Sequence, residues 1–181
     1  MKLFSSPRGF AVLGLLGTLI AGIAGCKIQK QDGGAGKRVD IETPIGNMHV
    51  DTAVDPKDTG LAVYPGATRA ADEEHKHAAN LTLDSSLFGV KVVAVKFRSG
   101  DPPEKLVEFY RSQLKAYGDV TECRGNATIV HDKVKCLHTG SGYGLVAGTE
   151  ERHHAVKVQP DGTGSTFELV YIQTREEKET Q

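Results

Sequence analysis

Histidines are the residues of this chain whose types and spacing most readily suggest chemistry. His75 and His77 lie in an acidic stretch, directly after two glutamates. Imidazole and carboxylate groups are ligands that zinc, copper and nickel accept. The stretch is therefore a candidate metal site, and His131 and His138 are further candidate ligands if the fold brings them close. The alternative is a solvated polar turn, which we favour because a metal site needs three or four rigidly held ligands.

Two other patterns suggest chemistry less directly. His153 and His154 are adjacent in a predicted strand, so their side chains should point to opposite faces, with one of them in solvent. The glycine-rich stretch 139–148 lies beside His138 and raises a small hydrolase as an alternative function. Neither a phosphate-binding motif nor a nucleophile elbow is present. The stretch is more typical of a flexible loop.

Cys123 and Cys136 form an even pair once the third cysteine, Cys26, is set aside. In an oxidising compartment such a pair favours a disulfide, and closing a loop of this length stabilises a fold by about 3 kcal/mol. The alternative is a metal site shared with nearby histidines, although the spacing matches no strong zinc pattern. We therefore expect a disulfide, and the first residues of the chain indicate the compartment.

The N-terminus has the build of an export signal. Lys2 and Arg8 precede a stretch without charge, residues 10–25, which ends in Ile23-Ala24-Gly25-Cys26. These four residues resemble the lipobox of bacterial lipoproteins. The resemblance implies cleavage of a signal helix, residues 1–25, and attachment of a covalent lipid such as palmitate to Cys26. Two or more acyl chains would hold the protein stably on a membrane.

Two alternatives compete with this interpretation. One is an uncleaved transmembrane helix, but a span needs about 20 apolar residues. The other is an ordinary signal peptide that leaves Cys26 as a free thiol. In Gram-negative lipoproteins an aspartate after the cysteine favours the inner membrane, so Lys27 indicates the outer membrane, on its periplasmic face or at the surface, if the host has one. The expected location is the cell envelope.

Length and composition predict one domain after the signal. Removing residues 1–25 from 181 leaves 156, a length typical of a single domain. We expect a flexible, glycine-containing tether at 26–37, a domain at 38–175 and a disordered charged tail at 176–181. The full chain has a net charge of −1, and no basic face is evident, which argues against a nucleic-acid partner.

The predicted fold is α+β. Short alternating strands flank one amphipathic helix at about 102–117, where Asp101 could cap the start and Gly118 the end. Its apolar positions recur at helical spacing: Leu106, Val107, Tyr110, Leu114 and Tyr117. An antiparallel sheet with this helix packed on one face accommodates the order of elements.

A second resemblance concerns the domain. Val63-Tyr64-Pro65-Gly66-Ala67, Phe97 through Ser99, and the stretch Asp101 to Tyr110 are similar to segments of small, uncharacterised bacterial envelope lipoproteins. The similarity supports the α+β layout and implies no activity. From the sequence we therefore expect a membrane-anchored, non-enzymatic domain that binds an envelope protein or a small ligand, without a cofactor. The alternatives are a metal-binding lipoprotein and a small hydrolase.

Overall fold

The computed structural model describes residues 27–33, 36–70, 78–130, 133–137 and 139–176. It contains a large antiparallel sheet and one α-helix, so the α+β prediction is confirmed. The predicted signal helix and Cys26 lie outside the described residues. So does the predicted tail, except for Glu176, which ends the last strand.

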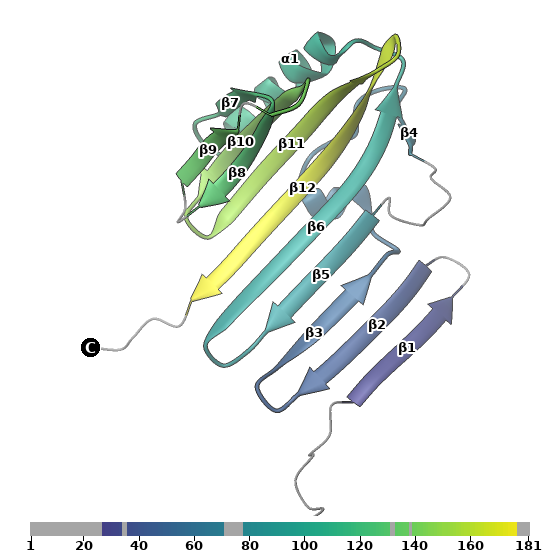
Figure 1. Ribbon diagram of the computed structural model, residues 1–181, viewed down its shortest axis with the longest axis vertical. Coiled ribbons are helices and arrows are strands. Elements are labelled where there is room, and N and C mark those ends of the chain that lie inside the picture. Colours follow the sequence, from purple (N-terminus) through teal and green to yellow (C-terminus); the bar gives the residue numbers. More distant parts are fainter. Residues whose placement is uncertain (1–26, 34–35, 71–77, 131–132, 138, 177–181) are drawn as a thin grey trace, which may run out of the picture.

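Ten strands form the main sheet, in the spatial order β1-β2-β3-β5-β6-β12-β11-β10-β7, with β4 paired to β6 (Figure 1). Their bounds are β1 Lys27–Gly33, β2 Gly36–Thr43, β3 Gly46–Asp51, β4 Thr68–Arg69, β5 Ala78–Asp84, β6 Phe88–Ser99, β7 Thr121–Arg124, β10 Tyr143–Thr149, β11 Arg152–Asp161 and β12 Gly164–Glu176. A separate hairpin consists of β8 Asn126–Val130 and β9 Lys133–Leu137.

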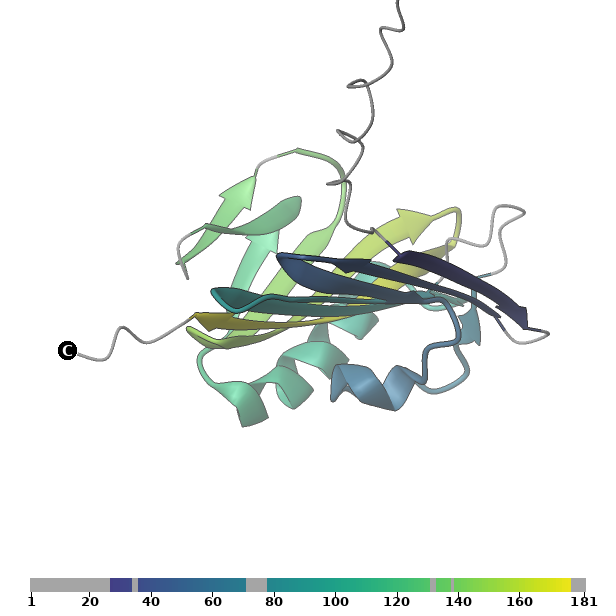
Figure 2. The same cartoon turned by 90° about the horizontal axis from the view of Figure 1, so that it is seen from below.

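Helices and hairpin lie on opposite sides of the sheet (Figure 2). The helix α1 (Pro103–Leu114) continues into the 3₁₀ turn η2 (Lys115–Tyr117). Together the two elements closely match the predicted helix at about 102–117. The 3₁₀ turn η1 (Pro56–Thr59) lies beside α1 on the same face. We call this the helix face, and we call the opposite side, over which β8–β9 lies, the outer face.

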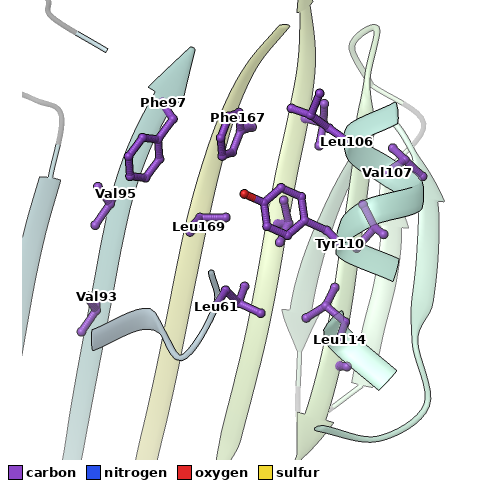
Figure 3. Packing of buried hydrophobic residues seen from close by; sticks show 14 of the residues in the cluster. Leu61, Val93, Val95, Phe97, Leu106, Val107, Tyr110, Leu114, Phe167 and Leu169 are labelled. Atoms are coloured by element: carbon purple, nitrogen blue, oxygen red, sulfur yellow. The ribbon is translucent and has the colours of Figure 1, made fainter. Parts of the chain in front are cut away.

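The main core lies between α1 and the helix face (Figure 3). Tyr110 is fully buried and packs near Phe167 on β12, with ring centroids 5.6 Å apart. Its hydroxyl accepts a hydrogen bond from the Tyr64 N–H at 3.0 Å, and burial raises the pKa of Tyr110 well above its ordinary value. This contact ties the turn at Pro65-Gly66, closed by Ala67 N–H donating to Tyr64 O, onto the helix.

Asp101 does not cap the helix. The N-cap is Pro102, in an extended conformation and without a side-chain cap. The Asp101 carboxylate instead accepts hydrogen bonds from Tyr64 Oη at 2.9 Å and from Lys105 Nζ at 2.7 Å. The predicted capping role was therefore wrong. The Asp101 carboxylate is instead hydrogen-bonded to two side chains, Lys105 on the helix and Tyr64 at the Pro65-Gly66 turn.

The predicted tether differs most from the structure. Lys27–Gly33 forms the edge strand β1, paired in register with β2 from Lys27↔Glu42 to Gly33↔Gly36. Of the glycines that suggested a flexible linker, Gly33 is the last residue of β1 and Gly36 is the first residue of β2. Pairing in a hairpin satisfies the backbone hydrogen-bonding groups of both strands, except along the outer edge of β1. The sheet therefore includes the segment 27–33, in place of a flexible tether.

The predicted disulfide is present. Cys123 on β7 and Cys136 on β9 are bonded, with Cα atoms 5.2 Å apart. The strands around it are arranged differently from the prediction: β7 pairs with β10 at the edge of the main sheet, whereas β8 and β9 pair with each other. The disulfide therefore joins the small hairpin to the main sheet, rather than joining two strands of one hairpin.

Candidate functional site

The outer face of the sheet carries a broad apolar surface. Its members are half-buried side chains on five adjacent strands, and we call this set the outer apolar face: Val39, Ile41, Met48, Val50, Leu81, Leu83, Val90, Val92, Ala94, Val170 and Ile172. Among the described residues, no helix or strand lies over its β2–β5 part (Figure 2). A partly exposed apolar surface that spans five strands is typical of an interaction site.

Strand register aligns these residues in continuous rows, because directly opposed residues in an antiparallel sheet share a face. One row crosses five strands and is followed on β11 by His153: Val39, Val50, Leu81, Val92 and Ile172. A second row crosses from β1 to β6: Ile28, Ile41, Met48, Leu83 and Val90. A third row is made of smaller side chains: Val146, Ala155, Val170, Ala94 and Ala79.

Several polar side chains of β2 and β3 point toward the helix face instead. Arg38 donates to Asp51 Oδ2 at 2.9 Å, and His49 contacts Asp40, across β2 and β3. Thr82 lies between Leu81 and Leu83 on β5 and therefore points away from the outer apolar face. The alternation of residues thus requires the outer face, rather than the helix face, to be the apolar side of this part of the sheet.

The hairpin β8–β9 forms one wall of a hollow of about 410 Å³ on the outer face. Ala127 and Ile129 line it from β8, while Ala155 and Val170 line it from the sheet. Gly144 allows the hairpin to approach closely, since a Cβ at this position would lie 3.0 Å from Ala127 Cβ. A pocket of a few hundred Å³ with apolar walls is of the size that holds a small ligand.

Charged residues border the apolar rows at the end of the hollow. Lys157, Glu168 and Lys96 form the next cross-strand row on the same face, and Lys157 and Glu168 line the hollow itself. The outer face therefore changes from apolar to charged along the strands. Such a surface matches an elongated apolar molecule that carries a polar head group.

The four candidate metal ligands His75, His77, His131 and His138 lie outside the described residues. Within the described part of the chain, no group of three or more His, Cys, Asp or Glu side chains is placed to hold a metal ion. The predicted metal site at these four histidines therefore remains a prediction.

His153 and His154 point to opposite faces, as their adjacency predicted, but neither is in solvent: they are 6% and 8% exposed. His154 Nδ1 lies 2.9 Å from Thr59 O, and because a carbonyl only accepts, Nδ1 carries the proton. Its ring stacks on Tyr117, with centroids 3.6 Å apart. Burial is the main cause that lowers the pKa of His154, so the ring is held neutral.

A hollow of about 510 Å³ opens beside His154. Its titratable lining residues are Lys57, Asp58, Tyr117, Arg152, His154 and Tyr171. Among the described residues, His154 is hydrogen-bonded only to a backbone carbonyl and to no carboxylate, so the base–orienter pair of a hydrolase is not assembled here. The contacts of His154 fit a structural role that fastens η1 to the sheet.

The glycine-rich stretch is also structural. Tyr143–Thr149 forms the strand β10, where a loop was expected. A Cβ at Gly148 would lie 2.0 Å from Arg152 O, which explains a glycine within the strand. The flexible loop that was expected is therefore replaced, over residues 143–149, by a regular part of the sheet.

Comparison with known proteins yields no match: no protein family model, curated protein or solved structure is significantly similar to the chain. None of the helices in the described part of the chain has the length and hydropathy needed to cross a membrane. The outer apolar face was missed in the sequence, although the alternation of Val90, Val92 and Ala94 on one side of β6 was visible. The missing information was the strand order, which places matching residues of β2, β3 and β5 beside them.

Proposed function

We propose that this chain is a lipid-anchored protein of the bacterial cell envelope, held by Cys26, whose domain is a non-enzymatic binding module for a fatty acyl chain. The outer apolar face is the observation that carries the proposal. Its rows of half-buried aliphatic side chains offer a long apolar track. An acyl chain gains free energy roughly in proportion to the apolar area that it removes from water.

The hollow under β8 is the proposed deep end of this site. Its walls combine apolar side chains from the hairpin and the sheet, and its rim carries Lys157 and Glu168. The polar head group would lie at this charged row, where Lys157 and Lys96 offer donors and Glu168 between them offers an acceptor, while the chain would extend along the row of small residues through Ala155 and Ala94. Ala155 and Ala94 leave room for a ligand where larger residues would fill the surface.

Titration with a naturally fluorescent polyene fatty acid tests this function. Residues 27–181 would be used, with strand content checked by circular dichroism. Ala155→Leu adds an isopropyl group that would occupy part of the hollow. Binding should weaken at least about tenfold, because a mismatch of even one methylene between a ligand and its pocket has about this effect. Ala53→Leu adds the same group at an exposed loop position and should leave affinity unchanged. Unsaturable binding, or equal affinity in both variants, would count against the proposal.

The anchor is tested separately by intact-mass analysis of the protein purified from bacterial membranes. The proposal expects a product that begins at Cys26 and carries the mass of at least two acyl chains. A Cys26→Ser variant should lose this mass and remain uncleaved. A native product that still contains Met1, or that has no mass added at the sulfur, would rule out the anchor but would leave the acyl-binding site to be judged by the titration.

A further inference from the structure

Three of the most exposed large apolar side chains in the described structure gather at one end of the sheet. Ile45 is 84% exposed, Leu87 is 68% exposed and Phe88 is 50% exposed. Ile45 lies in the turn between β2 and β3, and Leu87 and Phe88 lie at the turn between β5 and β6. We call these three residues the apolar tips. Exposed aliphatic and aromatic side chains together on adjacent turns are costly in water unless something covers them.

A hollow of about 400 Å³ lies between the two turns and joins the apolar tips to the outer apolar face. Ile41, Met48 and Leu83 line it together with the tips. The apolar surface is therefore continuous from the tips into the second row of the outer face.

The chain enters the sheet at this same end (Figure 1). One cross-strand row connects the first described residue to the strand residues that flank both turns: Lys27, Glu42, Asn47, Asp84, Gly89 and Arg175. Lys27 directly follows Cys26. From β1 to β6 the row crosses four strand intervals, a distance of roughly 19 Å at the usual spacing. Lys27, the residue that follows Cys26, thus lies at the same end of the sheet as the apolar tips.

We infer that this end of the domain docks on a phospholipid bilayer, with Ile45, Leu87 and Phe88 inserted among the lipids. The uncharged stretch 10–25 and Cys26 both precede Lys27, so either a lipid on Cys26 or an uncleaved N-terminus would hold this end at a membrane. The inference depends on the proposed function only for the lipid anchor that would keep the domain at the membrane; the docking surface itself is argued from the apolar tips. Its consequence is that the hollow between the tips opens onto the bilayer, so that an acyl chain can pass between lipid and protein without crossing water.

Tryptophan fluorescence tests the docking directly, because the chain contains no tryptophan. Leu87→Trp would be introduced into the full chain, purified from membranes and reconstituted into phosphatidylcholine vesicles with or without bromine atoms on the acyl chains. The inference expects a blue-shifted emission that brominated lipid quenches strongly. Thr163→Trp places the same reporter in the exposed turn between β11 and β12, at the opposite end of the sheet, and should be neither shifted nor quenched.

A second pair of variants tests the role of the apolar side chains. In the Leu87→Trp background, Ile45→Asp with Phe88→Asp should abolish most of the quenching. Leu137→Asp also adds a charge at an exposed leucine, which is 44% exposed and lies on β9 away from the tips. This control should leave the quenching intact. Quenching that is absent at position 87, or equal at positions 87 and 163, would overturn the inference.

Labelling of the unsubstituted chain covers the case in which a variant does not fold. A phospholipid with a photoreactive group deep in its acyl chain should label peptides that contain Ile45 and Leu87-Phe88, and labelling only elsewhere would overturn the docking. The mass of the same sample reports whether Cys26 carries lipid. If the apolar tips are labelled but Cys26 carries no added lipid mass, the lipid anchor is rejected and the docking is supported. If Cys26 carries the lipid mass but the tips are not labelled, the anchor is supported and the docking is rejected.

Discussion

Val92 and Val93 are neighbours on β6, but their side chains belong to two different apolar surfaces. Val93 is fully buried on the helix face, where it belongs to the main core. Val92 is half-buried on the outer apolar face, directly opposite Leu81 on β5 and Ile172 on β12. The central strand thus serves the folding core with one side and the proposed binding surface with the other.

Alanine substitutions should separate these two roles. Val93→Ala removes fully buried atoms and leaves a cavity, so it should lower the free energy of unfolding by about 2–3 kcal/mol. Val92→Ala should cost less than about 1 kcal/mol, because the side chain is only partly removed from water, but it should weaken fatty-acid binding. Urea unfolding and the fatty-acid titration measure the two effects. A larger stability loss at Val92 than at Val93 would contradict this assignment of the faces.

The Cys123–Cys136 disulfide should support the hollow as well as the fold. Replacing both cysteines by serine should lower the free energy of unfolding by about 3 kcal/mol. It should also weaken acyl binding, because β9 loses its bond to β7 and β8 is then held less firmly over the sheet. Hydrogen exchange should become faster in β8–β9 than in the β6–β12 pair. Unchanged binding with a loosened hairpin would remove β8 from the site.

Two glycines with positive φ provide a matched test of close backbone packing. Gly148→Ala would place a Cβ 2.0 Å from Arg152 O at φ +149°. Gly162→Ala, at φ +61°, would have no heavy atom within 4 Å and should cost only the strain of the left-handed conformation, about 1–2 kcal/mol. Thermal unfolding should therefore show a clearly larger loss for Gly148→Ala. Equal losses would mean that the turn after β10 adjusts readily.

The buried imidazole of His154 should make stability fall in mild acid. Because burial lowers the pKa of His154 in the folded state, the unfolded chain takes up this proton first as the pH falls through about 6.5. The stability contribution of the neutral ring is complete above that pH. It declines as the pH falls from there toward the lowered folded pKa. His154→Gln should remove this part of the pH dependence, measured by urea unfolding from pH 7.5 to 5. An unchanged slope in the variant would contradict the role given to His154.

Sequence patterns predicted those parts of the fold that depend on local chemistry. The helix followed from the spacing of Leu106, Val107, Tyr110 and Leu114, all of which are buried. The disulfide followed from cysteine number and the expected compartment, and is present.

The binding surface could not be predicted in the same way, because it depends on which strands are neighbours. Val50 on β3 and Leu81 on β5 are far apart in the sequence but directly opposed in the sheet. The segment 27–33 was also misjudged, since the glycines that follow it resemble a linker, and only pairing with β2 makes it a strand. Long-range pairing leaves little trace in a single sequence.

Acyl binding on the outer apolar face is tested most directly by photo-crosslinking of residues 27–181 with a fatty acid that carries a diazirine on its chain, followed by peptide mapping. Adducts are expected on the strands that form the outer apolar face, above all on β5, β6 and β12, and on β8 at the hollow. An excess of unmodified fatty acid should suppress them. Adducts confined to α1 and η1, or spread evenly over the surface and insensitive to competition, would show that the outer apolar face is not the acyl-binding site.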